Sequence, residues 1–172
     1  MNGAERIEAA LARAREDVHA TSSAPPDGGR RLRTLAIGDP QAPFQTFLTI
    51  LEAHDALDDD GRVPTDTALV SMGDHFDWGT RAERAQAADD AIALLSWLAA
   101  HPADQVVVIA GNHDLARVGE LAQVDDATFA AYQGKADAID REDDDANKAF
   151  AQETGFAWAE LVNRDYSPFR AA

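Results

Sequence analysis

The sequence predicts an α/β fold built around one βαβαβ unit. Three short apolar runs, at residues 32–37, 67–72 and 105–110, alternate with two amphipathic helical patterns. Each run ends at a glycine, and the third is rich in β-branched residues. Because strands that alternate with helices form parallel sheets through right-handed crossovers, the carboxyl ends of all three strands are expected along one edge.

Residues 1–30 are expected to form a helix and a linker, and residues 31–172 the main domain. Ile7, Leu11, Ala14 and Val18 recur at helical spacing over 4–18. The Pro- and Gly-rich stretch 21–29 then interrupts any regular element. The helix is either an arm docked on the domain or an extension that binds a partner, and docking is favoured.

The first crossover helix is expected over 44–57, followed by an acidic turn at 58–61. Its inward face would carry six apolar side chains: Phe44, Phe47, Leu48, Ile50, Leu51 and Leu57. The second helix is expected over 81–100, with five apolar side chains facing inward: Ile92, Leu94, Leu95, Trp97 and Leu98. The β-branched third strand is expected to be buried on both faces of the sheet. His101, after the second helix, is interpreted as structural and as a cation at the helix carboxyl end.

Beyond Asp114 the pattern is helical and acidic. The run at 140–145 is interpreted as a solvated face. A last apolar cluster, interpreted as core, is formed by Phe156, Trp158, Leu161 and Val162. The fold class is therefore a βαβαβ unit followed by a helical acidic segment.

Composition and charge exclude several classes of function. The chain has 172 residues, 45% of them hydrophobic, which is typical of a globular protein of one or at most two domains. A formal net charge of −16 argues against binding to nucleic acid or to anionic membranes, because like charges repel. The absence of cysteine excludes disulfides and zinc–thiolate sites. With no apolar run of about 18 residues and no signal-peptide pattern, a cytoplasmic protein is expected.

Polar side chains follow each strand directly. The three segments are Gly38-Asp39-Pro40-Gln41, Gly73-Asp74-His75-Phe76-Asp77-Trp78-Gly79 and Gly111-Asn112-His113-Asp114. Oxygen and imidazole donors that converge from neighbouring strands suit divalent metal ions, and a central carboxylate such as Asp74 can bridge two of them. The alternative is that these acids and amides only cap the helices that follow.

The three segments resemble the first three motifs of the calcineurin-like metallophosphoesterases: Asp-x-His, Gly-Asp-x-x-Asp-Arg-Gly and Gly-Asn-His-Asp/Glu. The resemblance covers about residues 35–114. It implies that the βαβαβ unit is half of an αββα sandwich, with two divalent metal ions (Mn, Fe or Zn) at one sheet edge. It also implies hydrolysis of a phosphate ester by metal-bound hydroxide.

The same resemblance implies the metal ligands. Asp39 would bind the first metal ion, Asp74 would bridge both, and Asn112 would bind the second. Gln41 stands where the family usually has histidine. Its carbonyl can still bind a hard ion, although it binds zinc less well than imidazole does.

Catalytic and substrate-binding roles follow from the resemblance in the same way. His113 would contact the phosphate and protonate the leaving oxygen, and Asp114 would orient its imidazole. Asn112 and His75 are further candidates for substrate binding. Asp77 is expected to brace its loop by accepting hydrogen bonds from backbone amides.

Two departures from the family motifs bear on function. Trp78 replaces the motif arginine, which disfavours a phosphoprotein phosphatase. The later Gly-His and Gly-His-x-His motifs have no counterpart, since none of the five histidines follows position 113. These residues are therefore expected to be the front part of a longer enzyme and to turn over feebly alone. The alternative is a truncated or degenerate, non-catalytic domain with at most weak metal binding. The exposed edge of a three-stranded sheet also predicts self-association.

Overall fold

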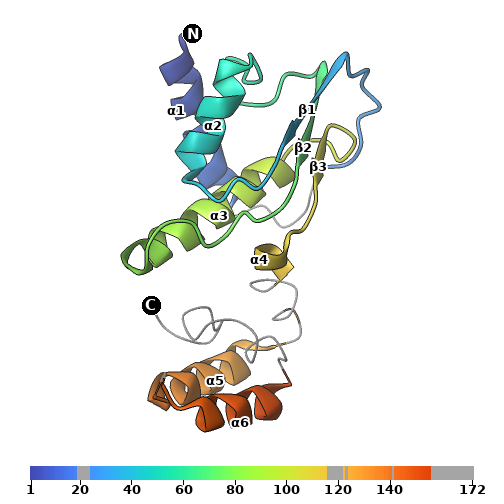
Figure 1. The fold of residues 1–172 in the computed structure, drawn as a ribbon. Coiled ribbons are helices and arrows are strands. Elements are labelled where there is room, and N and C mark those ends of the chain that lie inside the picture. Colours follow the sequence, from blue (N-terminus) through green and yellow to red (C-terminus); the bar gives the residue numbers. More distant parts are fainter. Residues whose placement is uncertain (19–23, 116–121, 123, 141, 156–172) are drawn as a thin grey trace. The chain divides into compact units, whose positions relative to one another are not determined.

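The computed structural model describes residues 1–18, 24–115, 122, 124–140 and 142–155. The chain divides into two compact units, Met1–Asp114 and Leu115–Ala172. The described elements follow the predicted α/β order, which confirms the fold class (Figure 1): α1 (Gly3–Asp17), β1 (Arg33–Ile37), α2 (Phe44–Ala53), β2 (Thr67–Ser71), a 3₁₀ turn (Arg81–Glu83), α3 (Arg84–Ala99), β3 (Val106–Val108), α4 (Asn112–Asp114), α5 (Asp126–Ala138) and α6 (Asp144–Thr154). None of the described helices is long and apolar enough to cross a bilayer. The predicted division of the sequence at residue 30 stays a prediction.

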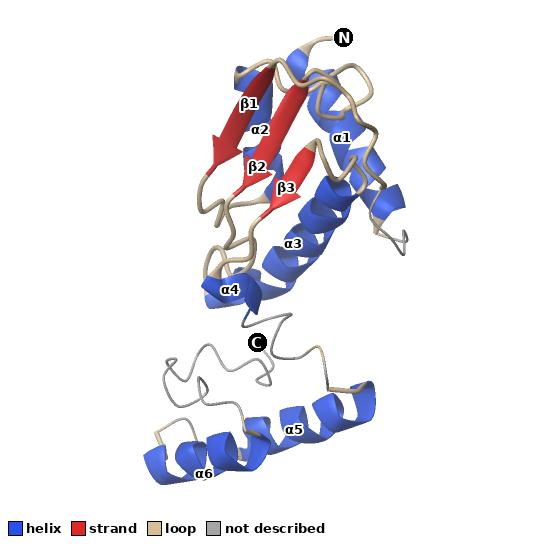
Figure 2. Cartoon of the chain, turned by 90° about the vertical axis from the view of Figure 1, so that its right-hand side faces the viewer, coloured by secondary structure: helices blue, strands red, loops and turns tan. Residues whose placement is uncertain are grey.

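The first unit is a two-layer arrangement of a sheet and helices. The three strands are parallel in the order β1-β2-β3. Figure 2 shows all three arrowheads pointing toward the same edge, with α1, α2 and α3 behind the sheet. The prediction that the carboxyl ends share one edge is therefore confirmed.

A single apolar core joins the helices to the inner face of the sheet. Trp97 lies at its centre, with its ring centroid 6.0 Å from that of Phe44 and 6.5 Å from that of Phe47. The indole N–H of Trp97 donates to the carbonyl of Gly61 at 3.0 Å, so its polar atom is satisfied. Each large apolar side chain that is fully buried contributes about 1.5–3 kcal/mol to folding. The other buried members are Ala10, Ala14, Leu48, Leu51, Ala56, Leu57, Val63, Leu69, Leu94, Leu98 and Val106.

Helix α1 packs against α2 and α3, in agreement with the prediction that it is docked on the domain. Ala10 and Ala14 are fully buried, and such small side chains let the helix lie close to its neighbours. The guanidinium of Arg6 forms a bidentate ion pair with Glu52 on α2, with N–O distances of 2.8 and 3.0 Å. This pair lowers the pKa of Glu52 below its usual value, chiefly through the side-chain hydrogen bond.

Helix α2 ends at Ala53, four residues before the predicted end. Asp55 has a left-handed backbone (φ +52°), which stops the helix. The guanidinium of Arg33 donates to the carbonyls of His54 and Asp55, and so satisfies groups that a longer helix would have used.

Two isoleucines were wrongly predicted to face the core. Ile50 is 42% exposed and Ile92 is 48% exposed. The buried stripe of α2 is limited to positions 44, 47, 48 and 51, which recur at three- and four-residue intervals. Ile50 falls outside this stripe, so its hydrophobicity alone was a poor guide to its direction.

The third strand is shorter and more exposed than predicted. It pairs over Val106–Val108 only, and Val107 and Val108 are 47% and 42% exposed. The prediction that it is buried on both faces is therefore wrong. Among the described strands β3 has a neighbour on one side only, so its exposed side chains are those of an edge strand. β-Branched residues favour extended backbone with or without full burial.

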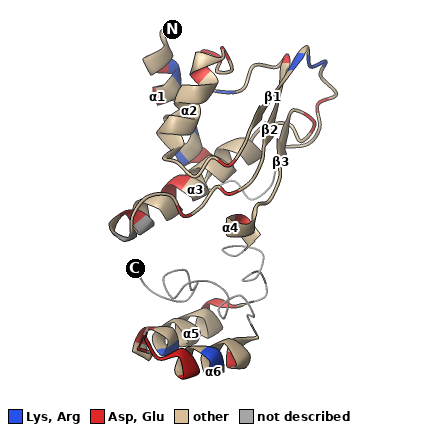
Figure 3. Ribbon diagram, viewed as in Figure 1, with Lys and Arg blue, Asp and Glu red and all other residues tan. Residues whose placement is uncertain are grey.

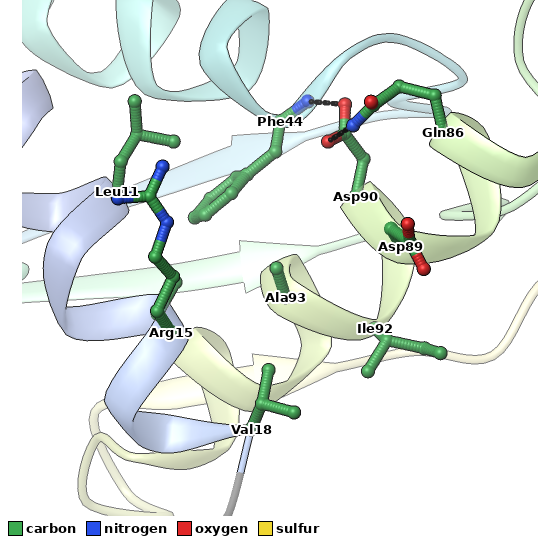
Figure 4. A pocket seen from close by; sticks show the side chains of 10 residues that line it. Leu11, Arg15, Val18, Phe44, Gln86, Asp89, Asp90, Ile92 and Ala93 are labelled. Atoms are coloured by element: carbon green, nitrogen blue, oxygen red, sulfur yellow. Dashed lines mark hydrogen bonds between the residues drawn. The ribbon is translucent and has the colours of Figure 1, made fainter. Parts of the chain in front are cut away.

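A cavity of about 410 Å³ lies between α1, α2 and α3 (Figure 4). At its rim the carboxylate of Asp90 accepts from the backbone N–H of Phe44 at 3.2 Å and from the amide of Gln86 at 2.8 Å. Asp90 thus caps the first turn of α2 from the neighbouring helix. The cavity is separate from the loops after the strands, since its walls come from the three helices and the residue that caps the end of α1: Leu11, Ala14, Arg15, Val18, Phe44, Gln86, Asp89, Asp90, Ile92 and Ala93.

The described part of the second unit is a pair of helices, α5 and α6. Tyr132 and Phe150 meet edge to face with ring centroids 6.2 Å apart. The acidic run is partly a cap, because the Asp143 carboxylate accepts from the N–H of Ala146 at 2.9 Å, whereas Asp144 and Asp145 are exposed as expected. The predicted apolar cluster lies outside the described residues: Phe156, Trp158, Leu161 and Val162.

Candidate functional site

The strand register brings the three polar loops to one edge of the sheet. The backbone ladder continues past the strand ends, because Met72 N–H donates to the Ile37 carbonyl at 2.9 Å and Ile109 N–H donates to the Ser71 carbonyl at 2.8 Å. The loops that carry Asp39, Asp74 and Asn112 therefore leave the sheet side by side.

Left-handed backbone conformations are concentrated in these loops. Asp39, Asp74 and Asp77 have φ values of +42°, +56° and +66°, and only one other non-glycine residue of the described part, Asp55, shares this feature. Such a conformation is unfavourable for residues with a side chain, although aspartate tolerates it better than most. Strain that gathers in one set of loops indicates a functional site.

The loops after β2 and β3 touch through two glycines. A Cβ on Gly73 would lie 2.5 Å from the backbone nitrogen of Gly111, and a Cβ on Gly111 would lie 2.1 Å from the Asp74 carboxylate. No side chain fits at either position without displacing backbone or Asp74. The glycines thus allow the two loops to approach each other.

The carboxylate of Asp114 joins these loops by accepting four hydrogen bonds. It accepts from the backbone N–H groups of Asp74, His75 and Gly111 and from Nδ1 of His75, each at 2.9 Å. Burial raises the pKa of Asp114, but the hydrogen bonds from Gly111 and His75 outweigh this effect and hold the pKa below its usual value. Asp114 was predicted to orient the imidazole of His113. It instead orients His75 and two backbone segments, because its side chain points toward the loop after β2.

The imidazole of His75 lies beneath the site and does not face solvent. Its side chain has no exposed surface. Nδ1 contacts the Asp114 carboxylate, and Nε2 lies 2.7 Å from the hydroxyl of Ser71 on β2. Both ring nitrogens are used inside the protein, which argues against the prediction that His75 binds substrate.

His113 is held from two directions. Its backbone N–H donates to Oδ1 of Asp74 at 2.9 Å, and its Nδ1 lies 3.1 Å from Oδ2 of Asp77. The side chain of His113 is 26% exposed and that of Asp77 is 12% exposed. Asp77, which was expected to brace backbone amides, thus supplies the carboxylate partner of His113. Sequence spacing held no signal for this pair, because the two residues come from different loops.

The predicted metal ligands present oxygen donors to solvent. Asp39, Gln41 and Asn112 are exposed, and their side chains make no hydrogen bond with any described residue. Asp74 uses one carboxylate oxygen for His113 and leaves the other without a partner among the described residues.

This ligand set fits a hard divalent ion better than zinc, because all of its donors are oxygens. Across the described part of the chain, no three His, Cys, Asp or Glu side chains come together in a way that could hold a metal ion. Since two of the four predicted ligands are amides, the set contains only the carboxylates of Asp39 and Asp74. The donor chemistry is suitable for Mn²⁺, and the number of charged donors is small.

Comparison with known protein families gave a match over most of the chain. A family model described as calcineurin-like phosphoesterase matches residues 32–166, which are most of the chain. The matched range includes β1, β2, β3 and all three strand-end loops, whereas α1 lies outside it. No curated protein and no solved structure matched.

Proposed function

The chain belongs to the calcineurin-like phosphoesterase family, and we propose that it is a metal-dependent phosphoester hydrolase that acts at the loops after β1, β2 and β3. Its small parallel sheet and its helices are consistent with a partial fold of this family. The observation that carries the proposal is that His113 is bonded both to Asp74 and to Asp77. An imidazole, its carboxylate partner and a predicted metal ligand are thus joined at one sheet edge.

Asp39, Gln41, Asp74 and Asn112 are the residues that would hold two divalent ions, with Mn²⁺ as the expected metal. When bound, such ions neutralise phosphate charge and lower the pKa of a water so that it can attack phosphorus. Asp74 would be the central ligand; the position of β2 between the other two strands supports this role. Its second carboxylate oxygen, which has no hydrogen-bond partner among the residues that the structure describes, is available for this role.

His113 would act as the proton donor to the leaving oxygen. With Nδ1 of His113 protonated, Oδ2 of Asp77 accepts a hydrogen bond from it, which would orient the ring and stabilise its positive charge. Proton transfer would then take place at Nε2. Because the backbone N–H of His113 is bonded to Asp74, the imidazole and the proposed central ligand keep a fixed relation to each other.

Mn²⁺ binding and ester hydrolysis test this proposal together. Mn²⁺ affinity is measured by calorimetry, and turnover is measured with an aryl phosphate monoester and a diester. Asp74→Asn is expected to weaken Mn²⁺ binding by about tenfold or more and to lower the rate in proportion. Asp89→Asn is the matched control, since this exposed carboxylate lies beside the cavity between the helices. Equal behaviour of the two variants would contradict the proposal.

A non-catalytic domain with weak metal binding is the second candidate. The small number of charged donors in the described part of the site favours it. It predicts Mn²⁺ binding that depends on Asp74 without hydrolysis of either ester, whereas the hydrolase predicts at least slow turnover. A cytoplasmic location stays a prediction.

A further inference from the structure

Three buried polar side chains form a continuous hydrogen-bonded chain beneath the candidate site. The hydroxyl of Ser71 lies 2.7 Å from Nε2 of His75, and Nδ1 of His75 lies 2.9 Å from Oδ2 of Asp114. The residues are 0%, 2% and 7% exposed, respectively. Because an ionised carboxylate can only accept, Nδ1 of His75 carries the proton in this chain.

We propose that His75 is a positioning residue for the candidate site. With Ser71 and Asp114 it forms a clamp, here called the His75 clamp, that holds the backbone of Asp74 in the conformation its carboxylate needs. The effect of the clamp on metal binding rests on the proposed function. Its effect on the loop backbone does not.

The backbone of Asp74 needs such a restraint. Its φ of +56° is unfavourable for a residue with a side chain, and its loop follows the end of β2. The N–H of Asp74 is held by Oδ2 of Asp114, while its own Oδ1 accepts from the N–H of His113. The backbone and the side chain of Asp74 are thus each held by a hydrogen bond, and the bond to the backbone depends on Asp114.

His75 determines how Asp114 is held. It supplies two of the four donors to the Asp114 carboxylate, one from its backbone and one from its ring. The other ring nitrogen is bonded to Ser71, whose carbonyl is part of the ladder with the segment after β3. The imidazole therefore links β2 to α4. An apolar ring of similar size would fill the same space but leave a buried carboxylate short of a donor.

A purely structural role is the competing explanation, and His101 provides a matched control for it. His101 is also buried, and its ring nitrogens are also both bonded, to the Trp97 carbonyl and the Val63 N–H. It follows the carboxyl end of α3 and lies outside the strand-end loops. A substitution there should lower stability without affecting the site.

The test compares His75→Phe, Ser71→Ala and His75→Asn with His101→Gln in the full chain. The readouts are the dissociation constant for Mn²⁺, hydrogen exchange of the Asp74, His75 and Gly111 amides by NMR, and unfolding by circular dichroism. His75→Phe is expected to weaken Mn²⁺ binding by about tenfold or more and to speed exchange at these three amides. His75→Asn, whose amide can still donate to Asp114, should recover part of both losses. His101→Gln should reduce stability only.

The outcomes separate the clamp from the proposed function. If His75→Phe lowers stability as His101→Gln does but keeps the wild-type Mn²⁺ affinity and the wild-type amide exchange rates, the proposal that His75 positions Asp74 is wrong. If the wild-type chain binds no Mn²⁺, the proposed function fails, and faster exchange confined to the three amides still supports the clamp. If His75→Phe does not fold, the smaller change Ser71→Ala decides the question by the same exchange measurement, and unchanged exchange there would overturn the clamp.

Discussion

His101 is a buried histidine whose ring is kept neutral by its neighbours. Nε2 accepts from the backbone N–H of Val63 at 3.1 Å, so that nitrogen cannot carry a proton without breaking the bond. Nδ1 donates to the carbonyl of Trp97 at 2.8 Å. Burial, with a contribution from the charge of Arg62, lowers the pKa of His101 to about 4. The interpretation of His101 as a helix-terminal cation is therefore wrong.

This shift predicts a pH dependence of stability. Between about pH 4 and 6.5 the unfolded chain binds a proton at His101 that the folded chain does not, so the free energy of unfolding rises with pH through this window. Stabilisation of roughly 2–3 kcal/mol is present above pH 6.5 and is lost as the pH falls toward 4. Urea unfolding at pH 7 and pH 5 should show a smaller difference for His101→Gln than for wild type. If the free energy of unfolding changed equally between the two pH values in wild type and in His101→Gln, His101 would not be the group responsible for the pH dependence.

A single substitution at Asp77 tests whether its hydrogen bond with His113 contributes to hydrolysis. Asp77→Asn removes the charge that holds Nδ1 of His113, while keeping the size of the side chain. Hydrolysis of an aryl phosphate ester in Mn²⁺ is expected to slow by about 10- to 100-fold, with little change in Mn²⁺ affinity. Asp89→Asn serves again as the control. An unchanged rate in Asp77→Asn would show that the pair has no part in the reaction.

At the scale of elements, the acidic turn after α2 is an anchor for helix α1. A Cβ on Gly61 would lie 2.2 Å from the backbone nitrogen of Ala10 and 2.6 Å from the carbonyl carbon of Ala9. The backbone of Gly61 is left-handed, with φ +71°, and its carbonyl accepts from the indole of Trp97. The turn therefore packs directly against α1 and the centre of the core.

Gly61→Ala is expected to destabilise the first unit by roughly 2–4 kcal/mol, because the new methyl meets helix backbone that cannot rotate away and the positive φ is strained. The free energy of unfolding is measured by urea titration followed by tryptophan fluorescence. Gly38→Ala is the matched control, since a Cβ at Gly38 would meet nothing within 4 Å. Similar stabilities of the two variants would show that α1 does not pack against the turn.

At the scale of the whole chain, the strongly negative charge of the protein contrasts with the uncharged strands β2 and β3. The formal net charge is −16, yet β2 and β3 carry no charged residue (Figure 3). Met72, Val107 and Ile109 are 51%, 47% and 46% exposed. An edge strand with exposed apolar side chains and without lysine or proline is prone to pair with another strand.

We therefore expect a second copy of the chain to associate through this part of the sheet. Sedimentation equilibrium should show a mass that increases with concentration. Val107→Lys should shift the equilibrium toward monomer, because it places a charge on the edge strand. Gln45→Lys, at an exposed position of α2, adds the same charge away from the sheet and should leave association unchanged. A monomeric wild-type chain at every concentration would contradict this expectation.

The order of elements and the location of the candidate site were predictable from the sequence. Apolar periodicity identified the three strands and the helices α1, α2 and α3, and the glycine followed by an acid or amide after each strand placed Asp39, Asp74 and Asn112 at one sheet edge. These features are local, since each depends on residues within a few positions of one another. The resemblance to the family rested on the same local motifs, and the family model that matches residues 32–166 confirms it.

The partners of the site residues were decided by the tertiary structure. His113 pairs with Asp77 rather than Asp114, His75 is buried rather than open to substrate, and β3 is an exposed edge rather than a buried strand. Each of these outcomes depends on the direction of a side chain relative to another loop or layer. Local pattern determines which residues reach the sheet edge, whereas hydrogen bonding between distant segments determines which of them face each other, because a buried donor must find its acceptor wherever the fold has placed one.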